Sequence, residues 1–259
     1  MGSIFSRTGV TNKMQKYFNV SLEFDHPRLK QIIETNILEN KKGYVCIVDA
    51  NVLTIAQKNS NYCDILNNSI VNSCDGSSIA LLAGIIHKKK FTALNGPDLF
   101  SYYIEKKYKQ LLLGSDEDTS TKIKNILKNK GIDDTHISVL SLPFMAVADF
   151  DYFEIAKSVN KLKPDIIWVS LGAPKQEFFM NKILPYINHG IMFGIGAAFN
   201  FYIGKIALPT IKVGRMKFIW LSRIFSEPKK QLSRIIPYIL LLPRLYLTEK
   251  KFLNRKGND

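Results

Sequence analysis

Seven short runs of apolar, strand-forming residues lie along the first four-fifths of the chain, separated by longer segments with apolar residues at every third or fourth position. Short apolar runs that alternate with helical segments are typical of βα units, which build a mostly parallel sheet with both faces buried. The pattern therefore predicts an α/β core, Rossmann-like in the broad sense. Its strands are expected at residues 44–48, 70–74, 90–94, 110–114, 136–140, 165–171 and 190–195.

The pattern changes after residue 204, so we expect a catalytic core at 1–204 and an appendage at 205–259. The appendage carries thirteen basic residues against three acidic ones, with apolar residues at helical spacing among them. Such a basic amphipathic helix binds in the interface of an anionic membrane. The alternative is a helix that packs on the core and keeps a solvated basic face. Because no apolar run approaches the roughly 20 residues that span a bilayer, we expect a peripheral membrane association.

Composition narrows the class of protein. The 259 residues, 46% of them hydrophobic, suffice for one well-buried α/β domain and a short extension. The net charge of +14 predicts an anionic partner and leaves nucleic acid, acidic lipid and a phosphorylated substrate open. The three cysteines and four histidines show no metal-ligand spacing. We therefore expect neither a metal site nor a disulfide framework, and a reducing cytoplasm fits best.

Asp75 stands between a predicted strand and a predicted helix, whose apolar stripe contains Ile79, Leu82, Ala83 and Ile86. Ligands of open α/β sheets bind at this edge, beyond the carboxyl ends of the strands. An Asp here is also a good helix N-cap, with a contribution of about 1 kcal/mol. Spacing alone leaves both roles open. As a base, a carboxylate kept ionised by the helix dipole would accept a proton only as a substrate hydroxyl becomes acidic in the transition state.

Two further strand-to-helix turns carry glycine. The turn at 171–177 places Pro174 at the first helical position and adds Lys175 and Gln176 beside backbone N–H groups that suit an anion. Its plainer interpretation is a tight turn with solvated side chains. The turn at 194–199 begins like a dinucleotide fingerprint, but Phe199 stands at its sixth position and no acidic residue follows about 20 positions later. Its glycines either admit a diphosphate or allow tight packing.

Taken in chain order, these motifs resemble the WecG/TagA/CpsF family of bacterial glycosyltransferases. The resemblance spans roughly residues 44–246 and adds Asn51 after the first strand and an Asn-Gly-Pro-Asp-Leu element at residues 95–99. It continues from Gly196 to Lys205 and ends on a Trp-Leu-Ser-Arg element that leads to Glu-Pro. Each motif is common, whereas the set in this order is specific.

The resemblance implies an inverting, metal-independent transfer in cell-surface polysaccharide synthesis. A sugar of the N-acetylmannosamine type would move from a UDP-sugar to a polyprenyl-diphosphate-linked sugar at the cytoplasmic face of the membrane. Asp75 is implied as the base on the acceptor hydroxyl, and basic residues would stabilise the leaving diphosphate. No cofactor is implied, because the UDP-sugar is a substrate. The residues expected to bind the substrates are Asp49, Asn51, Asn95, Lys175, Gln176, Asn200, Arg223, Lys230 and Arg234.

Several positions depart from the family pattern. Asp49 stands in place of a common Thr, Ala93 in place of a common Arg, and Asn200 in place of the usual Asp. The appendage offers Lys230 and Ser233 at two expected Arg positions. These departures bear on the donor sugar more than on the reaction. Loss of the Arg means either weaker activity or its replacement by Lys88, Lys89 or Lys90.

Other classes of function remain open from the residues alone. An oxidoreductase would use the turn at 194–199, and a nucleic-acid-binding module would use the basic appendage. The resemblance disfavours both, so we expect no nucleic-acid partner. Two Asp-x-Asp strings, at 116–118 and 149–151, are weak candidates for metal ligands. The appendage would close the active site of its own subunit or, in a homo-oligomer, that of a neighbour.

Overall fold

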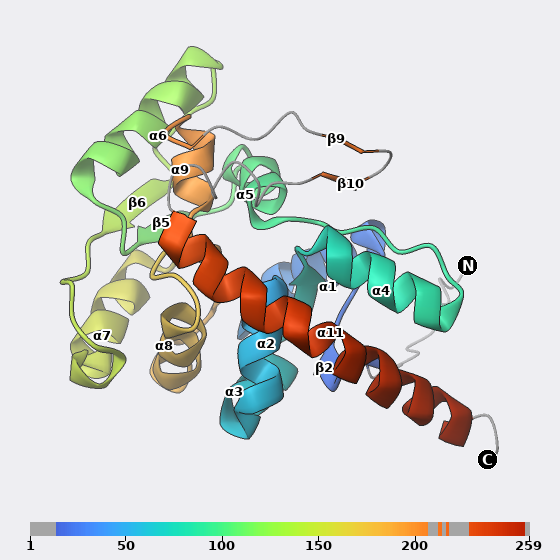
Figure 1. Cartoon of the computed structure of the whole chain (residues 1–259). Helices are drawn as coiled ribbons and strands as arrows, with labels where there is room; N and C mark the ends of the chain where they lie inside the picture. The colour runs from blue at the N-terminus through green and yellow to red at the C-terminus, as the bar shows by residue number, and fades with distance from the viewer. Residues whose placement is uncertain (1–13, 207–211, 214–215, 218–227, 257–259) are drawn as a thin grey trace, which may run out of the picture.

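The computed structural model describes residues 14–206, 212–213, 216–217 and 228–256 (Figure 1). A six-stranded sheet, parallel throughout, forms its centre in the order β4-β3-β8-β7-β5-β6. The predicted α/β fold class is therefore confirmed. The strands are β3 (Lys42–Val48), β4 (Val71–Cys74), β5 (Gln110–Leu113), β6 (Ile137–Leu140), β7 (Ile166–Val169) and β8 (Gly190–Gly194).

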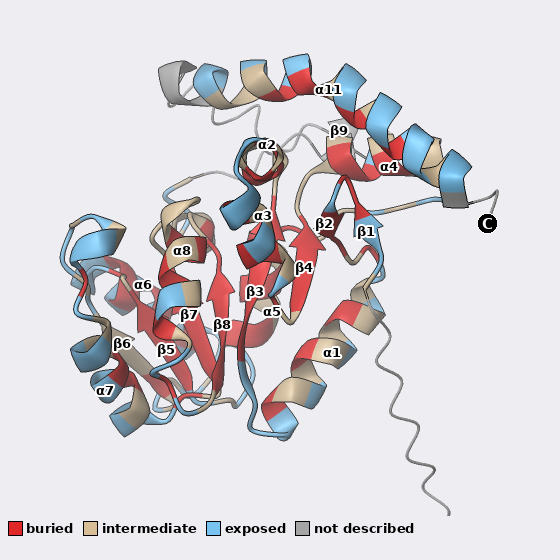
Figure 2. Ribbon diagram, turned by 90° about the horizontal axis from the view of Figure 1, so that it is seen from below, coloured by how far each residue is buried: buried red, intermediate tan, exposed pale blue. Residues whose placement is uncertain are grey.

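Helices cover both faces of the sheet, and its strands are buried except for the edge strand β6, where only Ile137 is buried (Figure 2). Successive strand residues alternate between two hydrophobic cores; Leu111 and Leu113 belong to one and Leu112 to the other. One core is closed by α1 (His26–Leu38), α5 (Gly96–Ile104), α6 (Glu117–Asn129) and α9 (Ala198–Tyr202). The other is closed by α2 (Ala50–Lys58), α3 (Ser60–Asn67), α7 (Tyr152–Leu162) and α8 (Lys175–Ile183), with the short 3₁₀ helix η1 (Val147–Asp149) beside α8.

The strand predicted at 90–94 is wrong, whereas the other six predicted strands are present. Only Leu94 bonds to the sheet from this segment, through its N–H to the Cys74 carbonyl at 2.8 Å. The outer edge of β4 is already covered, because the Glu23 N–H donates to the Asn72 carbonyl at 2.9 Å. Instead of adding a strand, the segment places the Phe91 ring against the core, where aromatic stacking holds it.

A small hairpin precedes the core and was not predicted. It pairs β1 (Lys16–Tyr17) with β2 (Val20–Ser21) in antiparallel register. The two turn residues, Phe18 and Asn19, have φ values of 54° and 64°, which suits a primed hairpin turn. Phe18 is nonetheless buried in the core, so packing overrides the poor fit of Phe to this backbone conformation. A second small sheet pairs β9 (Lys212–Val213) with β10 (Met216–Lys217).

Helices α4 (Ser77–His87) and α11 (Pro228–Lys256) lie across the end of the molecule toward which the strands point (Figure 2). α11 packs on the core through a stripe at helical spacing, made of Tyr238, Leu241, Leu245 and Glu249. The appendage is thus docked on the core along one face. In the described part of the chain, no helix is both long and apolar enough to cross a bilayer.

Candidate active site

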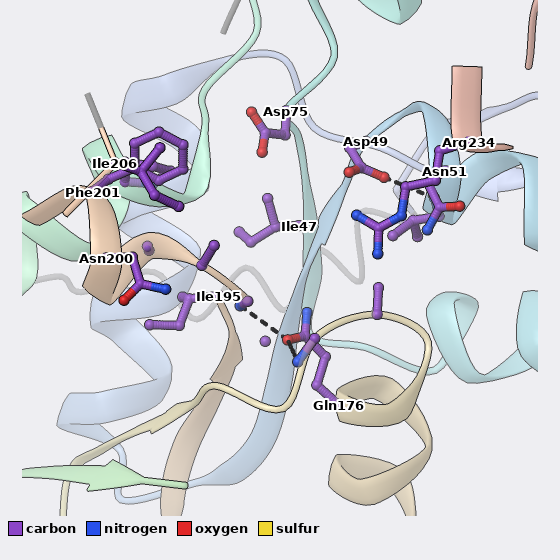
Figure 3. A pocket seen from close by; sticks show the side chains of 18 of the residues that line it. Ile47, Asp49, Asn51, Asp75, Gln176, Ile195, Asn200, Phe201, Ile206 and Arg234 are labelled. Atoms are coloured by element: carbon purple, nitrogen blue, oxygen red, sulfur yellow. Dashed lines mark hydrogen bonds between the residues drawn. The ribbon is translucent and has the colours of Figure 1, made fainter. Parts of the chain in front are cut away.

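A pocket of about 580 Å³ opens at the carboxyl edge of the sheet, above β3, β4, β7 and β8 (Figure 3). This edge is where open α/β sheets bind ligands, and the volume is within the ordinary range for small-molecule sites. Seven polar side chains line the pocket and come from both the core and the appendage. They are Asp49, Asn51, Asp75, Gln176, Asn200, Lys205 and Arg234.

Asp75 follows β4 directly and is fixed through its backbone, whose N–H donates to the Val48 carbonyl at 3.0 Å. The N-cap position of α4 belongs to Gly76, with φ −88° and ψ 110°, so Asp75 stands one residue before the helix cap. Figure 3 shows the Asp75 carboxylate between two groups of lining residues, one that contains Asp49 and one that contains Asn200. The Asp75 carboxylate therefore lies in the pocket, at the edge where open α/β sheets bind ligands.

The turn after β3 supplies Asp49 and Asn51 to one side of the pocket. Asp49 is the N-cap of α2, and its Oδ1 accepts from the Val52 N–H at 2.8 Å. Arg234 reaches this side from α11, and Figure 3 places its guanidinium near Asp49 and Asn51. The appendage thus contributes a cation to the pocket of its own chain, which is the first of the two predicted ways of closing the site.

The opposite side of the pocket is built by α9 and the residues that follow it. Asn200, Phe201 and Ile206 lie together here (Figure 3). Lys205 also lines the pocket, and sequence reasoning did not select it as a site residue. The pKa of Asp116, the exposed N-cap of α6, is lowered mainly by hydrogen bonds from Thr119, and the nearby charge of Lys205 adds to the effect. Lys205 is thus a second cation at the pocket, placed on the far side from Arg234.

Gln176 lines the pocket, but its amide is engaged by the protein itself. Its Oε1 accepts from the backbone N–H of Gly172 at 3.1 Å and of Gly196 at 3.0 Å, shown as dashed lines in Figure 3. Its Nε2 donates to Glu177 Oε1 at 2.8 Å. The Gly196 N–H, which a dinucleotide-type turn would direct at a phosphate, is therefore used to hold two protein turns together.

Two predicted substrate-binding residues lie outside the lining of this pocket. The Lys175 ammonium donates to the Met145 carbonyl and lies 5.1 Å from the centre of the Phe150 ring. Asn95 is the buried N-cap of α5, where its Oδ1 accepts from the Asp98 N–H at 2.8 Å. The strand-to-helix turn predicted before Lys175 is confirmed, whereas no helix was predicted after Asn95. The sequence did not reveal that their side chains serve local structure.

The appendage leaves two predictions without side-chain detail. Arg223 lies outside the described residues, and Lys230 is described only as part of the backbone of α11. Pro174 was predicted at the first helical position but occupies the N-cap of α8, with a cis peptide bond before it. The structure therefore tests the position of Arg234 alone among the three basic residues expected in the appendage.

The two Asp-x-Asp strings contribute helix caps. Asp116 Oδ1 accepts from the Thr119 N–H at 2.6 Å, and Asp151 Oδ1 accepts from the Glu154 N–H at 3.0 Å. Within residues 14–206 and the described parts of the appendage, no group of three or more His, Cys, Asp or Glu side chains is placed to hold a metal ion. Among the described residues that line the pocket, Lys205 and Arg234 are the basic ones.

Comparison with known proteins decides the family. Residues 17–256 match the Glycosyl transferase WecG/TagA/CpsF family. The chain belongs to this family. The resemblance drawn from the motifs is thereby confirmed, and the protein is a glycosyltransferase. The match runs to the end of α11, so the helix that brings Arg234 to the pocket lies within the region shared with the family.

Two relatives of the transferase carry the same name, N-acetylglucosaminyldiphosphoundecaprenol N-acetyl-beta-D-mannosaminyltransferase. The relative from Bacillus subtilis (strain 168) is 23% identical over 235 residues, which cover 88% of this chain and 90% of the relative. The relative from Bacillus spizizenii (strain ATCC 23059 / NRRL B-14472 / W23) is 22% identical over 209 residues, which cover 76% of this chain and 77% of the relative. The transferase thus spans most of the length of both proteins.

Proposed function

We propose that the transferase moves an N-acetylmannosamine-type sugar from a UDP-sugar to a polyprenyl-diphosphate-linked N-acetylglucosamine, with inversion at the anomeric carbon. The acceptor class and the sugar follow the names of the two relatives. The observation that carries the proposal is the pocket, in which the carboxylate of Asp75 lies among amide side chains and shares the cavity with Lys205 and Arg234. One base and separate cations are what a single displacement at a glycosyl diphosphate needs.

The reaction is then a direct displacement. The acceptor hydroxyl oxygen attacks the anomeric carbon and loses its proton to the Asp75 carboxylate as the new glycosidic bond forms. The bond between the anomeric carbon and the diphosphate oxygen breaks, and UDP leaves with the electron pair. Lys205 and Arg234 stabilise the negative charge that develops on the diphosphate, as fixed cations do in a partly buried site. Asn51 and Asn200 supply amide groups to orient the sugar and the nucleotide.

A donor screen tests this function. The full chain is incubated with a short-chain polyprenyl-diphosphate N-acetylglucosamine and each of a panel of UDP-sugars. The mass of the lipid product is then measured by mass spectrometry. We expect one added N-acetylhexosamine, release of UDP and a β-linkage by NMR. UDP should also raise the melting temperature, whereas NAD(P) should not. Transfer with retention, or stabilisation by NAD(P) without any transfer, would contradict the proposal.

The surface of α11 supports a peripheral location on the membrane. Opposite its packing stripe, the helix exposes a face that is apolar, with basic residues beside it, among them Arg244 and Lys251. α4 lies next to it and exposes Leu81 and Ile85. The exposed apolar side chains of α11 are Leu232, Ile236, Ile239, Leu240, Leu247 and Phe252. A lipid-linked acceptor in the cytoplasmic leaflet would meet the pocket from this side, where α4 and α11 both begin.

The exposed face of α11 should control membrane binding. We expect Leu240→Asp, at a side chain 75% exposed, to weaken sedimentation with anionic vesicles by roughly tenfold or more, because burial of one Leu contributes about 2 kcal/mol. Leu38→Asp on α1, at a side chain 76% exposed, is the matched control and should bind like wild type. Equal binding by both variants, or tighter binding to duplex DNA than to vesicles at the same salt, would contradict the membrane location.

A further inference from the structure

A buried carboxyl group, Glu177, lies behind the pocket and takes no part in the displacement described above. It stands in the first turn of α8 and is 0% exposed. Its Oε1 accepts from Gln176 Nε2 at 2.8 Å, and its Oε2 accepts from the Tyr62 hydroxyl at 3.0 Å. Both donors are neutral, so the charge of this carboxylate is held by hydrogen bonds alone. A buried carboxyl group in this setting is unusual enough to require an explanation.

Its partner Gln176 joins the two turns that form the floor of the pocket. Gly172 follows β7 and Gly196 follows β8, and both have the positive φ values, 75° and 53°, that glycine adopts without strain. The backbone N–H groups of both turns converge on the single Oε1 atom of Gln176. The position of this amide therefore sets the position of both turns.

The two ends of the Gln176 amide differ chemically, and the two glycine N–H groups together with Glu177 favour the same end toward the turns. With Oε1 toward Gly172 and Gly196, all the hydrogen bonds pair a donor with an acceptor. A rotated amide would set its NH₂ group against two N–H donors and its oxygen against the carboxylate. An ionised carboxylate can only accept hydrogen bonds, and it binds an N–H more strongly than a neutral acid does. Ionised Glu177 therefore holds the amide in the observed orientation.

We propose that Glu177 is a positioning residue of the transferase: in its ionised form it orients the Gln176 amide and thereby holds the turns at Gly172 and Gly196 in the conformation that receives the donor. The proposal rests on the proposed function, because the pocket is taken as the donor site. Glu177 lines no part of the pocket and touches no reacting atom in the proposed displacement. It acts through Gln176.

The protonation of Glu177 changes within the working range of pH. Burial raises its pKa to about 7, against the opposing effect of hydrogen bonds from Gln176, its own backbone and Tyr62, while Asp49 adds to the rise. The titratable groups that face it are Tyr62 from α3, Cys46 from β3 and Asp49 at the start of α2. Burial raises the pKa of Tyr62 and of Cys46 above their ordinary values, so neither carries charge near pH 7. Activity should therefore rise with pH through about 7, as Glu177 ionises.

The test compares the pH dependence of kcat/KM for transfer in wild type, Glu177→Gln and Tyr62→Phe. Gln mimics the protonated acid, so we expect Glu177→Gln to lose the rise near pH 7 and to be slower at pH 8 on the order of tenfold. Tyr62→Phe removes a hydrogen bond to the charged form, so its rise should move to higher pH. Glu154→Gln, at the exposed first turn of α7, is the matched control and should keep the wild-type profile.

Two measurements separate this role from a merely structural one. The side-chain amide signal of Gln176 in ¹⁵N NMR, assigned by its loss in Gln176→Ala, should titrate with a midpoint near 7 in wild type and stay constant in Glu177→Gln. The melting temperature of Glu177→Gln relative to wild type should be higher at pH 8 than at pH 5, because wild type alone buries a charge at pH 8. A wild-type pH profile in Glu177→Gln, with a lower melting temperature at both pH values, would overturn the proposal.

The NMR titration also keeps this proposal distinct from the proposed function. If no UDP-sugar is transferred by wild type, the proposed function fails, while the Gln176 signal still reports whether Glu177 controls the amide. If transfer occurs and the signal does not titrate, the proposed function stands and the positioning role of Glu177 is wrong.

Discussion

Asp75→Asn should lower kcat for sugar transfer by roughly 10²-fold to 10⁴-fold, which is the usual contribution of a positioned general base. The amide cannot take the proton of the acceptor hydroxyl, while its size and position match those of the carboxylate. KM for the donor should change little, because the variant keeps Lys205 and Arg234, the residues proposed to bind the diphosphate. The measurement is steady-state release of UDP in the presence of the lipid acceptor, with the product confirmed by mass.

The free energy of unfolding provides the control for this prediction. Asn and Asp are equally favourable next to a helix N-terminus, so urea unfolding of Asp75→Asn should match wild type. Asp118→Asn, at an exposed carboxylate on α6, should leave both rate and stability unchanged. Full activity in Asp75→Asn would show that another group is the base. A loss of activity that follows a loss of stability would return Asp75 to a structural role.

Local patterns were enough to place Asp75 but not to choose its role. The apolar run that becomes β4 and the stripe that becomes α4 are both short-range features, so their junction could be placed from the sequence. Whether an Asp at such a junction is the N-cap depends on whether the helix begins at the next residue or one residue later. The sequence Asp75-Gly76 allows either residue at the N-cap, and only the observed dihedral angles assign it to Gly76.

The features that the sequence did not reveal depend on contacts between distant segments. The segment at 90–94 has a strand-like composition, but the edge of β4 that it would join is covered by Glu23, about 70 positions earlier. Gln176 was expected to bind substrate on the resemblance to the family. Nothing in its own motif shows that the Gly196 N–H will donate to its side chain. Lys205 follows a glycine in an ordinary turn and reaches the pocket only through the packing of α9.

The appendage was predicted either to bind a membrane or to pack on the core, and α11 packs on the core while exposing an apolar face. Tyr238, Leu241 and Leu245 face the core, while Leu240 and Leu247 on the other side of α11 face solvent. The Tyr238 hydroxyl donates to Ser78 Oγ at 3.1 Å, one turn along from Asp75 on α4. The contact that docks α11 therefore lies close to the proposed base, and Arg234 is one helical turn away on α11.

Glu249→Ala should lower the free energy of unfolding by about 3 kcal/mol, because it removes the hydrogen-bond partner of two buried groups. Glu249 is buried, its Oε2 accepts from the Phe18 N–H at 2.8 Å, and its Oε1 lies 2.9 Å from His87 Nε2. It thus ties α11 to α4 and to the N-terminal hairpin at once. Without it, the Phe18 N–H and the His87 ring would be left buried and unsatisfied, and Phe18 already holds a positive φ. The measurement is urea unfolding followed by circular dichroism.

Glu154→Ala, which breaks an exposed ion pair with Lys157, is the control and should cost less than about 1 kcal/mol. Equal losses in the two variants would show that the Glu249 network adds nothing to the docking of α11. The same variant should also raise KM for the donor, since Arg234 lies on α11 and reaches the pocket only while that helix is docked. Arg234→Ala should reproduce the kinetic defect without the loss of stability, because Arg234 is only partly buried. If both variants raise KM, the kinetic effect of Glu249 comes from the position of α11. An unchanged KM in Glu249→Ala would show that Arg234 reaches the pocket without this contact.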